Sequence, residues 1–193
     1  MKNRVDVINK VIEENNYTTY LEIGFQYGIS FNGVKCGDKA AVDPNPLAEG
    51  CAFKMTSDEF FDKALNVANE KQYKKPDVIF IDGDHSFEQS LKDFDNSLKI
   101  LDKGGAIIFH DTNPPTEAHA TPQPTLGEWC GEVYKTIVEL RKRGYYLYTY
   151  PFDFGVTVVY PHKNNQLEIP TFDGDVDYKL FNENRNTILN IVA

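Results

Sequence analysis

The apolar residues from Val78 to Ile81 follow one another without alternating with polar ones. A strand with one face in water alternates between apolar and polar side chains, whereas a strand covered on both faces appears as a continuous apolar run. Such strands belong to parallel sheets with helices on both faces, so this run predicts a central strand of an α/β fold. The run from Ala106 to Phe109 has the same character and predicts a second buried strand.

Amphipathic helical patterns separate these strands. Ser86 and Gln89 form a capping box, and apolar residues at helical spacing follow it, namely Phe87, Leu91, Phe94, Leu98 and Leu101. Similar patterns predict helices near residues 4–14, 56–71, 128–144 and 176–192, and further strands at 19–23, 40–42, 53–55, 145–150 and 156–160.

The order of these elements predicts the fold. Strands and helices that alternate over residues 1–144 imply right-handed βαβ units in an open parallel sheet, and the last two strands predict an antiparallel hairpin. Four prolines between Asp111 and Gly127 exclude regular structure there and predict a long surface loop.

Length and charge narrow the function classes. The chain has 193 residues, which suits one domain, and its 20 Lys and Arg against 29 Asp and Glu give a net charge of −9. This balance argues against nucleic acid or an anionic membrane surface as a partner. No apolar run approaches the ~18 residues of a membrane span, and the first ten residues lack a signal-peptide core, so we expect a soluble, cytoplasmic protein. The scattered Cys36, Cys51 and Cys130 indicate neither disulfides nor a zinc thiolate site.

Small or polar residues follow each of five predicted strands. These clusters are 24–28, 43–45, 56–58, 82–85 and 110–112. Ligands of open α/β sheets bind outside the carboxyl ends of the strands, so the clusters should border one cleft. Any single cluster could merely cap a helix or form a turn, but five such clusters together favour a binding site.

The first two clusters are typical of a nucleoside site. Gly24 and Gly28 follow Glu22, and glycines there allow a tight turn and a close approach of the ligand. Gln26 occupies the middle position of the three-glycine phosphate fingerprint, which argues against NAD. Asp43, about 20 residues after the first glycine turn, stands where an acid can accept hydrogen bonds from ribose hydroxyls.

The last two clusters are rich in acids and histidines, namely Asp82, Asp84, His85, His110 and Asp111. Carboxylates at close quarters repel one another unless a cation or shared protons offset their charge. Mg²⁺ or Mn²⁺ is the simplest such cation, and a neighbouring histidine could take a proton from a metal-held hydroxyl. The alternative is that Asp82 caps a turn and both histidines are structural; zinc is less favoured without thiolates.

The sequence resembles the class I S-adenosylmethionine-dependent methyltransferases, and within them the group called methyltransferase domain 24. The resemblance rests on segments spread over nearly the whole chain, among them YLEIGFQYG, AVDPNP, DVIFIDGDHSFEQSLKD, GGAIIFHDTNPPTE and GEWCGEVYKTIVELR. It implies a Rossmann-like α/β fold, with a mostly parallel seven-stranded sheet, a terminal antiparallel hairpin and helices on both faces. It also implies one domain over residues 1–193, with 161–193 as a C-terminal extension ending in a helix.

The resemblance also implies the cofactor contacts. Glu22, Gly24 and Gly28 would hold the methionine end of S-adenosylmethionine, and Asp43 would hold its ribose. The adenine edge would face Ser57 and Asp58.

Further along, the segment from Asp82 to His85 is similar to the D-G-x-H element of metal-dependent sugar O-methyltransferases. By that similarity Asp82 would bind both the cofactor and the metal, and His85 would be the general base. His110 and Asp111 stand where related enzymes complete the metal site with an acid and an amide, so they are the remaining candidate ligands.

We therefore expect an S-adenosylmethionine-dependent O-methyltransferase that acts on a hydroxyl of a small molecule, with a sugar or glycoconjugate as the acceptor favoured by the resemblance. Mg²⁺ or Mn²⁺ would assist the transfer. Two alternatives stay open: a metal-dependent, hydroxylase-like enzyme on the same fold, and a non-catalytic cofactor-binding subunit. A homo-oligomer is compatible with the sequence, which selects no interface.

Overall fold

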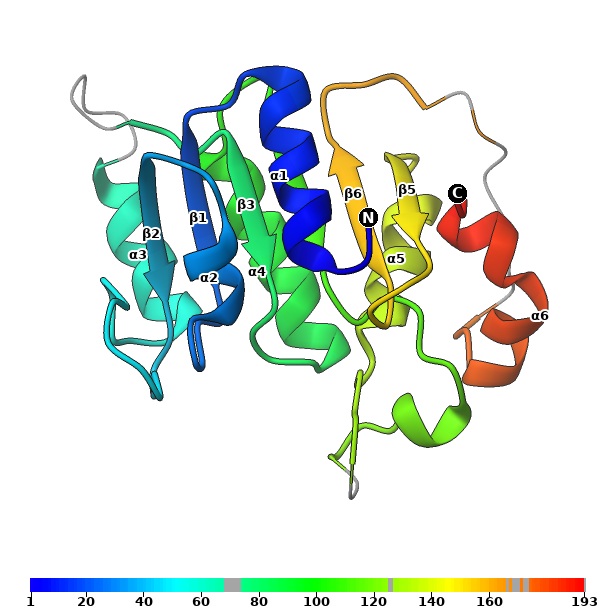
Figure 1. Ribbon diagram of the computed structural model, residues 1–193. Helices are drawn as coiled ribbons and strands as arrows, with labels where there is room; N and C mark the ends of the chain where they lie inside the picture. The colour runs from blue at the N-terminus through cyan, green and yellow to red at the C-terminus, as the bar shows by residue number, and fades with distance from the viewer. Residues whose placement is uncertain (68–73, 125–126, 166, 168–170, 172–173, 193) are drawn as a thin grey trace.

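The structure of the protein is a computed structural model that describes residues 1–67, 74–124, 127–165, 167, 171 and 174–192. Six strands form one sheet in the order β2-β1-β3-β4-β6-β5 (Figure 1). They are β1 (Thr19–Ile23), β2 (Asp38–Val42), β3 (Val78–Ile81), β4 (Ala106–Phe109), β5 (Tyr146–Tyr150) and β6 (Val156–Tyr160). The first four are parallel, whereas β6 runs antiparallel to both β4 and β5, so the predicted hairpin is confirmed.

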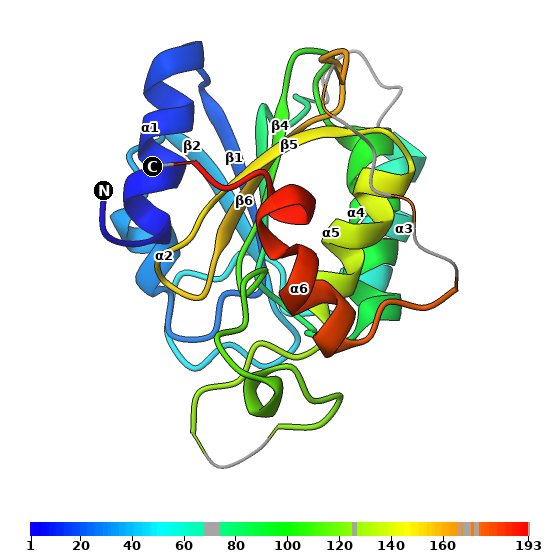
Figure 2. The ribbon, with the colours of Figure 1, turned by 90° about the vertical axis from the view of Figure 1, so that its right-hand side faces the viewer.

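Helices cover both faces of the sheet (Figure 2). They are α1 (Arg4–Asn15), α2 (Ile29–Gly33), α3 (Ser57–Val67), α4 (Phe87–Ile100), α5 (Val133–Lys142) and α6 (Tyr178–Leu189). In Figure 2, α1 and α2 lie on one side of the sheet and α3, α4 and α5 on the other. Every residue of β3 and β4 is buried, as their continuous apolar runs predict.

The sheet has six strands, so the prediction of seven was wrong. The missing strand, expected at 53–55, is reduced to a single parallel bridge between Phe53 and Val42. Its extended segment is cut short because Thr56 enters the capping box of α3, where its N–H donates to Glu59 Oε2 over 3.0 Å. Only Phe53 is left to pair with the edge of β2.

The buried face of α4 also differs from the predicted one. Its fully buried residues include Ser90, Asp93 and Ser97 beside Phe94 and Ile100, while Leu91 and Leu98 are only partly buried. The helix packs between α3 and α5, and small polar side chains allow that close approach. Ser90 Oγ lies 2.6 Å from Thr136 Oγ1 of α5, so the hydroxyls satisfy each other.

The segment after β4 is mostly loop, as expected, but Glu117–His119 forms one turn of 3₁₀-helix. The following helix begins at Val133 rather than near residue 128, which leaves Trp129 in the loop. In the part of the chain that the structure describes, no helix combines the length and apolar character that crossing a bilayer requires.

Candidate functional site

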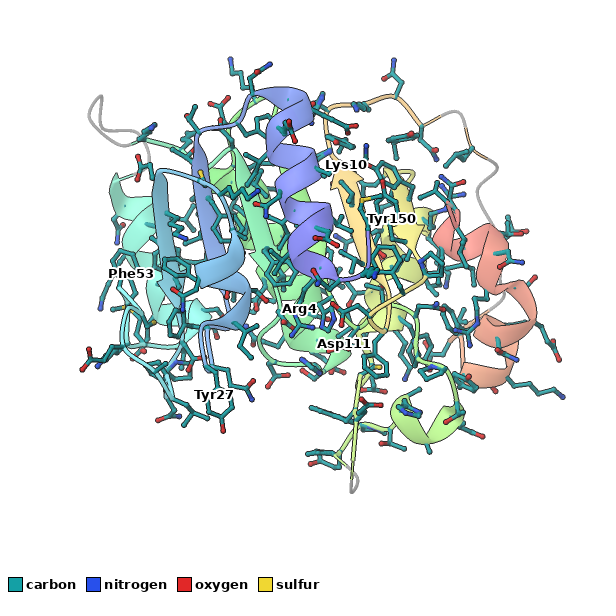
Figure 3. The ribbon with its side chains drawn as sticks, viewed as in Figure 1. Arg4, Lys10, Tyr27, Phe53, Asp111 and Tyr150 are labelled. Atoms are coloured by element: carbon teal, nitrogen blue, oxygen red, sulfur yellow. The ribbon has the colours of Figure 1, made fainter. Side chains whose placement is uncertain are left out.

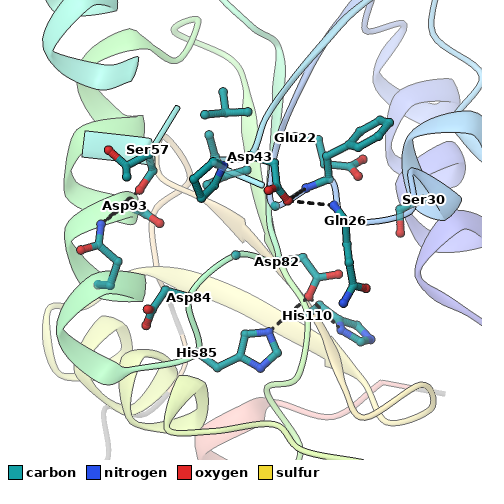
Figure 4. A pocket seen from close by; sticks show the side chains of 18 of the residues that line it. Glu22, Gln26, Ser30, Asp43, Ser57, Asp82, Asp84, His85, Asp93 and His110 are labelled. Atoms are coloured by element: carbon teal, nitrogen blue, oxygen red, sulfur yellow. Dashed lines mark hydrogen bonds and ion pairs between the residues drawn. The ribbon is translucent and has the colours of Figure 1, made fainter. Parts of the chain in front are cut away.

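A cavity of about 630 Å³ opens at the carboxyl ends of β1, β2, β3 and β4 (Figure 4). All five predicted clusters contribute to its lining, so their convergence on one cleft is confirmed. The lining includes these predicted site residues: Glu22, Gly24, Asp43, Ser57, Asp58, Asp82, Asp84, His85, His110 and Asp111. Gly28 is not among the lining residues.

Different contacts explain why the two positions after β1 are glycines. Gly24 has a φ of +94°, and a Cβ on it would lie 2.0 Å from the backbone oxygen of Asp82. The glycine therefore lets the loops after β1 and β3 touch. Gly28, with a φ of +68°, stands at the start of α2, where a Cβ would meet the ring of Phe25 at 2.5 Å. Contact with that ring explains the glycine at this position, although Gly28 itself does not line the cavity.

Asp43 fastens the loop after β1 to the end of β2. Its Oδ2 accepts the N–H groups of Phe25 and Gln26 at 2.9 and 2.8 Å, and Oδ1 accepts that of Asn45 at 2.7 Å. Gln26 has a φ of +45°, which is uncommon for a residue other than glycine. A carboxylate offers about four acceptor positions, so Asp43 can still accept a hydrogen bond from a ligand hydroxyl.

The wall formed by α3 and α4 carries a small polar network. Gln89 Nε2 donates to Ser57 Oγ at 3.1 Å, to Asp58 Oδ1 at 3.2 Å and to Asp93 Oδ1 at 3.0 Å. Lys92 binds Asp58 at 2.6 Å and lowers the pKa of that carboxyl group. Burial raises the pKa of Asp93 to about 6.

Asp93 lines the cavity but does not belong to any of the clusters predicted from the sequence. It is 1% exposed, and its Oδ2 has no hydrogen-bond partner among the described residues. Ser90, Asp93 and Ser97 recur at helical spacing on one face of α4. This spacing is a sequence signal for Asp93, because polar residues are seldom buried unless they have polar partners or a function.

Asp82, His85 and Asp111 form the chemical centre of the cavity. Each offers one ligand atom, and these atoms lie within 4.8 Å of one another. His85 Nε2 is 3.7 Å from Asp82 Oδ1 and 3.5 Å from Asp111 Oδ2. Burial disfavours the charged form of His85, but the two carboxylates outweigh it and raise the pKa of the ring. Asp111 has a φ of +58°, a strained conformation of the kind that clusters at functional sites.

The loop before α5 holds His85 on a second side. The ring of Trp129 stacks on that of His85, with centroids 4.9 Å apart and an angle of 19° between the planes. The N–H of Glu132 donates to the backbone oxygen of His85 at 2.7 Å. Gly131, with a φ of +63°, lies so close that a Cβ would come within 2.4 Å of the same oxygen. The helical periodicity from residue 128 predicts Trp129 on a helix, whereas the structure has it in the loop before α5, so the pattern does not predict this contact.

His110 contacts the carboxylates of both Asp82 and Asp111. Its Nδ1 is 3.2 Å from Asp82 Oδ1 and 3.1 Å from Asp111 Oδ2, and its Nε2 is 2.8 Å from Nη1 of Arg4. Burial opposes the charge on His110, but the surrounding carboxylates, above all that of Asp82, raise its pKa to about 11. The ring thus sits beside the group formed by Asp82, His85 and Asp111 instead of within it.

The acids of this centre are surrounded by cationic groups from the chain itself. Burial disfavours ionised Asp82, but His110, His85 and Arg4 together hold its pKa well below the usual range. The contacts of His85 and His110 with these carboxylates are the arrangement in which shared protons would offset the repulsion.

Glu22 is buried in β1, and burial raises its pKa to about 8. Its Oε2 accepts the hydroxyl of Tyr20, and the charge of Asp82 adds to the shift. The native state therefore holds a proton on Glu22 that an unfolded chain releases above a pKa of about 4.5.

We expect Glu22→Gln to stabilise the protein in a pH-dependent way. Between pH 4.5 and 8 the native state binds more protons than the unfolded state, so Glu22 makes stability fall as pH rises. Glutamine cannot ionise, so its advantage should grow across this window, on the order of 2–4 kcal/mol. Urea unfolding at pH 4.5, 6.5 and 8.5 measures it, with the exposed Glu13→Gln as control. An advantage independent of pH would contradict the assignment.

Comparisons with known proteins agree with this geometry. Residues 21–112 match the model of a family described as "Methyltransferase domain". This is the family that the sequence resembles. An uncharacterized protein of Acanthamoeba polyphaga mimivirus is 29% identical over 117 residues, which are 51% of this chain and 53% of that protein. The chain thus spans about half the length of the curated relative it matches.

Solved structures show the same fold. An O-methyltransferase of Bacillus cereus, in complex with S-adenosylhomocysteine, has a TM-score of 0.57 at 16% identity, covering 81% of this chain and 80% of that one. The O-methyltransferase TomG of Streptomyces achromogenes, in complex with S-adenosylmethionine, has a TM-score of 0.54 at 12% identity, covering 83% and 80%. The chain has the Rossmann-like class I methyltransferase fold, and residues 21–112, which contain every predicted site residue, match the model of the methyltransferase domain family.

Proposed function

We propose that the protein is an S-adenosylmethionine-dependent O-methyltransferase that methylates a hydroxyl of a small molecule, with a sugar or glycoconjugate as acceptor. One observation carries the proposal: a single cavity joins the nucleoside-type wall of Asp43 and Ser57 to the acid–histidine group around His85. A methyl donor and an acceptor oxygen must meet in one place, and this cavity offers both halves of such a site.

The residues present fit the cofactor. The cavity volume of about 630 Å³ lies within the range of small-molecule sites. Its lining is strongly acidic, which suits a ligand with a sulfonium and an ammonium group. Asp43 is placed for a ribose, and the wall of Ser57 and Asp58 for an adenine edge. When bound, S-adenosylmethionine supplies an activated methyl group, so orientation of the acceptor can provide much of the rate.

In this proposal His85 removes the proton from the acceptor hydroxyl. Its Nε2 faces Asp82 and Asp111, which stabilise the imidazolium that forms. Trp129 fixes the plane of the ring. These contacts resemble the usual arrangement of a general base, in which a carboxylate and a packing partner orient the imidazole.

The same residues fit a divalent cation. Asp82 and Asp111 offer two carboxylates within 4.8 Å of each other, which suit Mg²⁺ or Mn²⁺ and leave the imidazole of His85 free to act as the base. Asp82 and Asp111 would hold the cation, which would lower the pKa of the acceptor hydroxyl. His110, predicted as a ligand, contacts both carboxylates through Nδ1 and would orient them.

Removal of the metal should therefore lower the methylation rate. Because Asp82 and Asp111 are the proposed ligands, we expect dialysis against EDTA to reduce the rate about tenfold or more and Mn²⁺ to restore it. Asp84→Asn is the matched control and should respond to EDTA and Mn²⁺ as the unaltered protein does. Asp84 lines the same cavity, but it accepts the N–H of Ser86 and lies outside the group of Asp82, His85 and Asp111. An unchanged rate in EDTA would show that the chain's own cationic groups suffice.

The proposed function is tested by binding and transfer together. Calorimetry should show micromolar binding of S-adenosylmethionine, and a methyl-labelled cofactor should transfer label to a member of a panel of sugars, glycosides and phenols. Binding without transfer to any hydroxyl compound would favour a non-catalytic cofactor-binding subunit. Failure to bind S-adenosylmethionine or S-adenosylhomocysteine would refute the proposal.

A further inference from the structure

Arg4 is the sole lysine or arginine among the described residues that line the cavity. The other charged groups of the lining are acids and the two histidines discussed above. A cation in such surroundings is strongly attracted to the acids, and its guanidinium also offers a planar set of N–H donors that an anionic ligand group could use.

The fold holds the guanidinium of Arg4 in place from three sides. Asn3 caps α1, so the helix starts at Arg4, whose N–H donates to Asp153 Oδ2 at 2.8 Å. Its Nη1 is 3.2 Å from Asp153 Oδ1 and its Nε donates to Ser30 Oγ at 2.9 Å. Nε also lies 3.8 Å from Asp82 Oδ2. The side chain is therefore anchored by the β5–β6 turn, by α2 and by the end of β3.

One terminal nitrogen of Arg4 remains available. Nη2 makes no hydrogen bond with the residues that the structure describes, and the side chain is 26% exposed. Figure 3 places Arg4 at the start of α1, near Asp111. Its partner Ser30 lies with Glu22 on the side of the cavity opposite Ser57 and Asp93 (Figure 4). Arg4 thus stands at the end of the cavity farthest from the expected adenine.

We propose that Arg4 binds the α-carboxylate of the methionine moiety of S-adenosylmethionine. This inference rests on the proposed function and adds a binding residue to it. The carboxylate is the one anionic group of that ligand, and without a cation it would be repelled by Asp82 and its acidic neighbours. An anchored guanidinium recognises a carboxylate through charge-assisted hydrogen bonds and loses little side-chain entropy in doing so.

A ligand that lacks only the carboxylate tests the proposal. Decarboxylated S-adenosylmethionine keeps the adenosine, the sulfonium and the amine. In Arg4→Met we expect the dissociation constant for S-adenosylmethionine, measured by calorimetry, to rise on the order of 10- to 100-fold. The affinity for the decarboxylated ligand should stay the same or increase, because a cation that repels its amine has been removed.

Further variants separate recognition from structure. Arg4→Lys keeps the charge and should recover part of the preference for the carboxylated ligand. Arg143→Met is the control for loss of one positive charge, since Arg143 pairs with Asp95 and Glu139 outside the cavity. Equal weakening of both ligands in Arg4→Met, or no change in either, would overturn the proposal. If the unaltered protein binds neither ligand nor S-adenosylhomocysteine, the proposed function itself fails.

Discussion

Replacement of His85 by alanine is expected to lower kcat for methyl transfer by about 10²–10⁴. The variant removes the imidazole that faces Asp82 and Asp111 and leaves no other base stacked in the same position by Trp129. The affinity for S-adenosylmethionine should change little, because Asp43 and Ser57 line the cavity on another side. Initial rates at saturating cofactor, together with calorimetry, separate the two effects.

His162→Ala is the matched control for this prediction. His162 is exposed in the turn after β6 and does not line the cavity, so its loss should leave kcat unchanged. The dependence of kcat on pH gives a second test, since loss of the base should remove the lower limb of the profile. A near-normal rate in the His85 variant would place the base elsewhere.

Gly24→Ala is expected to be the most disruptive substitution at the cofactor end of the cavity. The new Cβ would lie 2.0 Å from the backbone oxygen of Asp82, and no rotamer change can relieve a clash with backbone. The φ of +94° adds strain for any residue with a Cβ. We expect a loss of stability on the order of 2–4 kcal/mol and, where the variant folds, at least a tenfold weaker binding of S-adenosylmethionine.

Urea unfolding and calorimetry measure both effects of Gly24→Ala. Gly37→Ala is the control, since a Cβ there meets nothing within 4 Å and its φ lies outside the left-handed region. That substitution should be neutral or slightly stabilising. Wild-type stability and affinity in Gly24→Ala would mean that the loops after β1 and β3 can separate without consequence for the site.

Much of the fold follows from local sequence signals. The runs from Val78 to Ile81 and from Ala106 to Phe109 predict buried parallel strands because water touches neither of their faces. The convergence of the polar clusters was predictable for a related reason. Once strands are parallel, their carboxyl ends share one edge, and residues as distant in sequence as Asp43 and Asp111 meet there.

The remaining features depend on contacts between distant segments. Whether Phe53 begins a strand depends on the length left before the cap of α3, and burial of Asp93 depends on how closely α4 approaches its neighbours. Arg4 carries no sequence signal of its own, because its position is set by Asp153, which lies 149 residues away. Periodicity alone predicts Trp129 on a helix, although that helix begins only at Val133.

The loop before α5 holds both the ring and the main chain of His85, through Trp129, Gly131 and Glu132. Mutations that reshape this segment to admit a different acceptor would also displace the proposed base. Changes in acceptor scope should therefore come at lower cost from the part of the loop before Trp129, while residues 129–132 tolerate little variation. Libraries aimed at new acceptors would do best to randomise the former and leave the latter untouched.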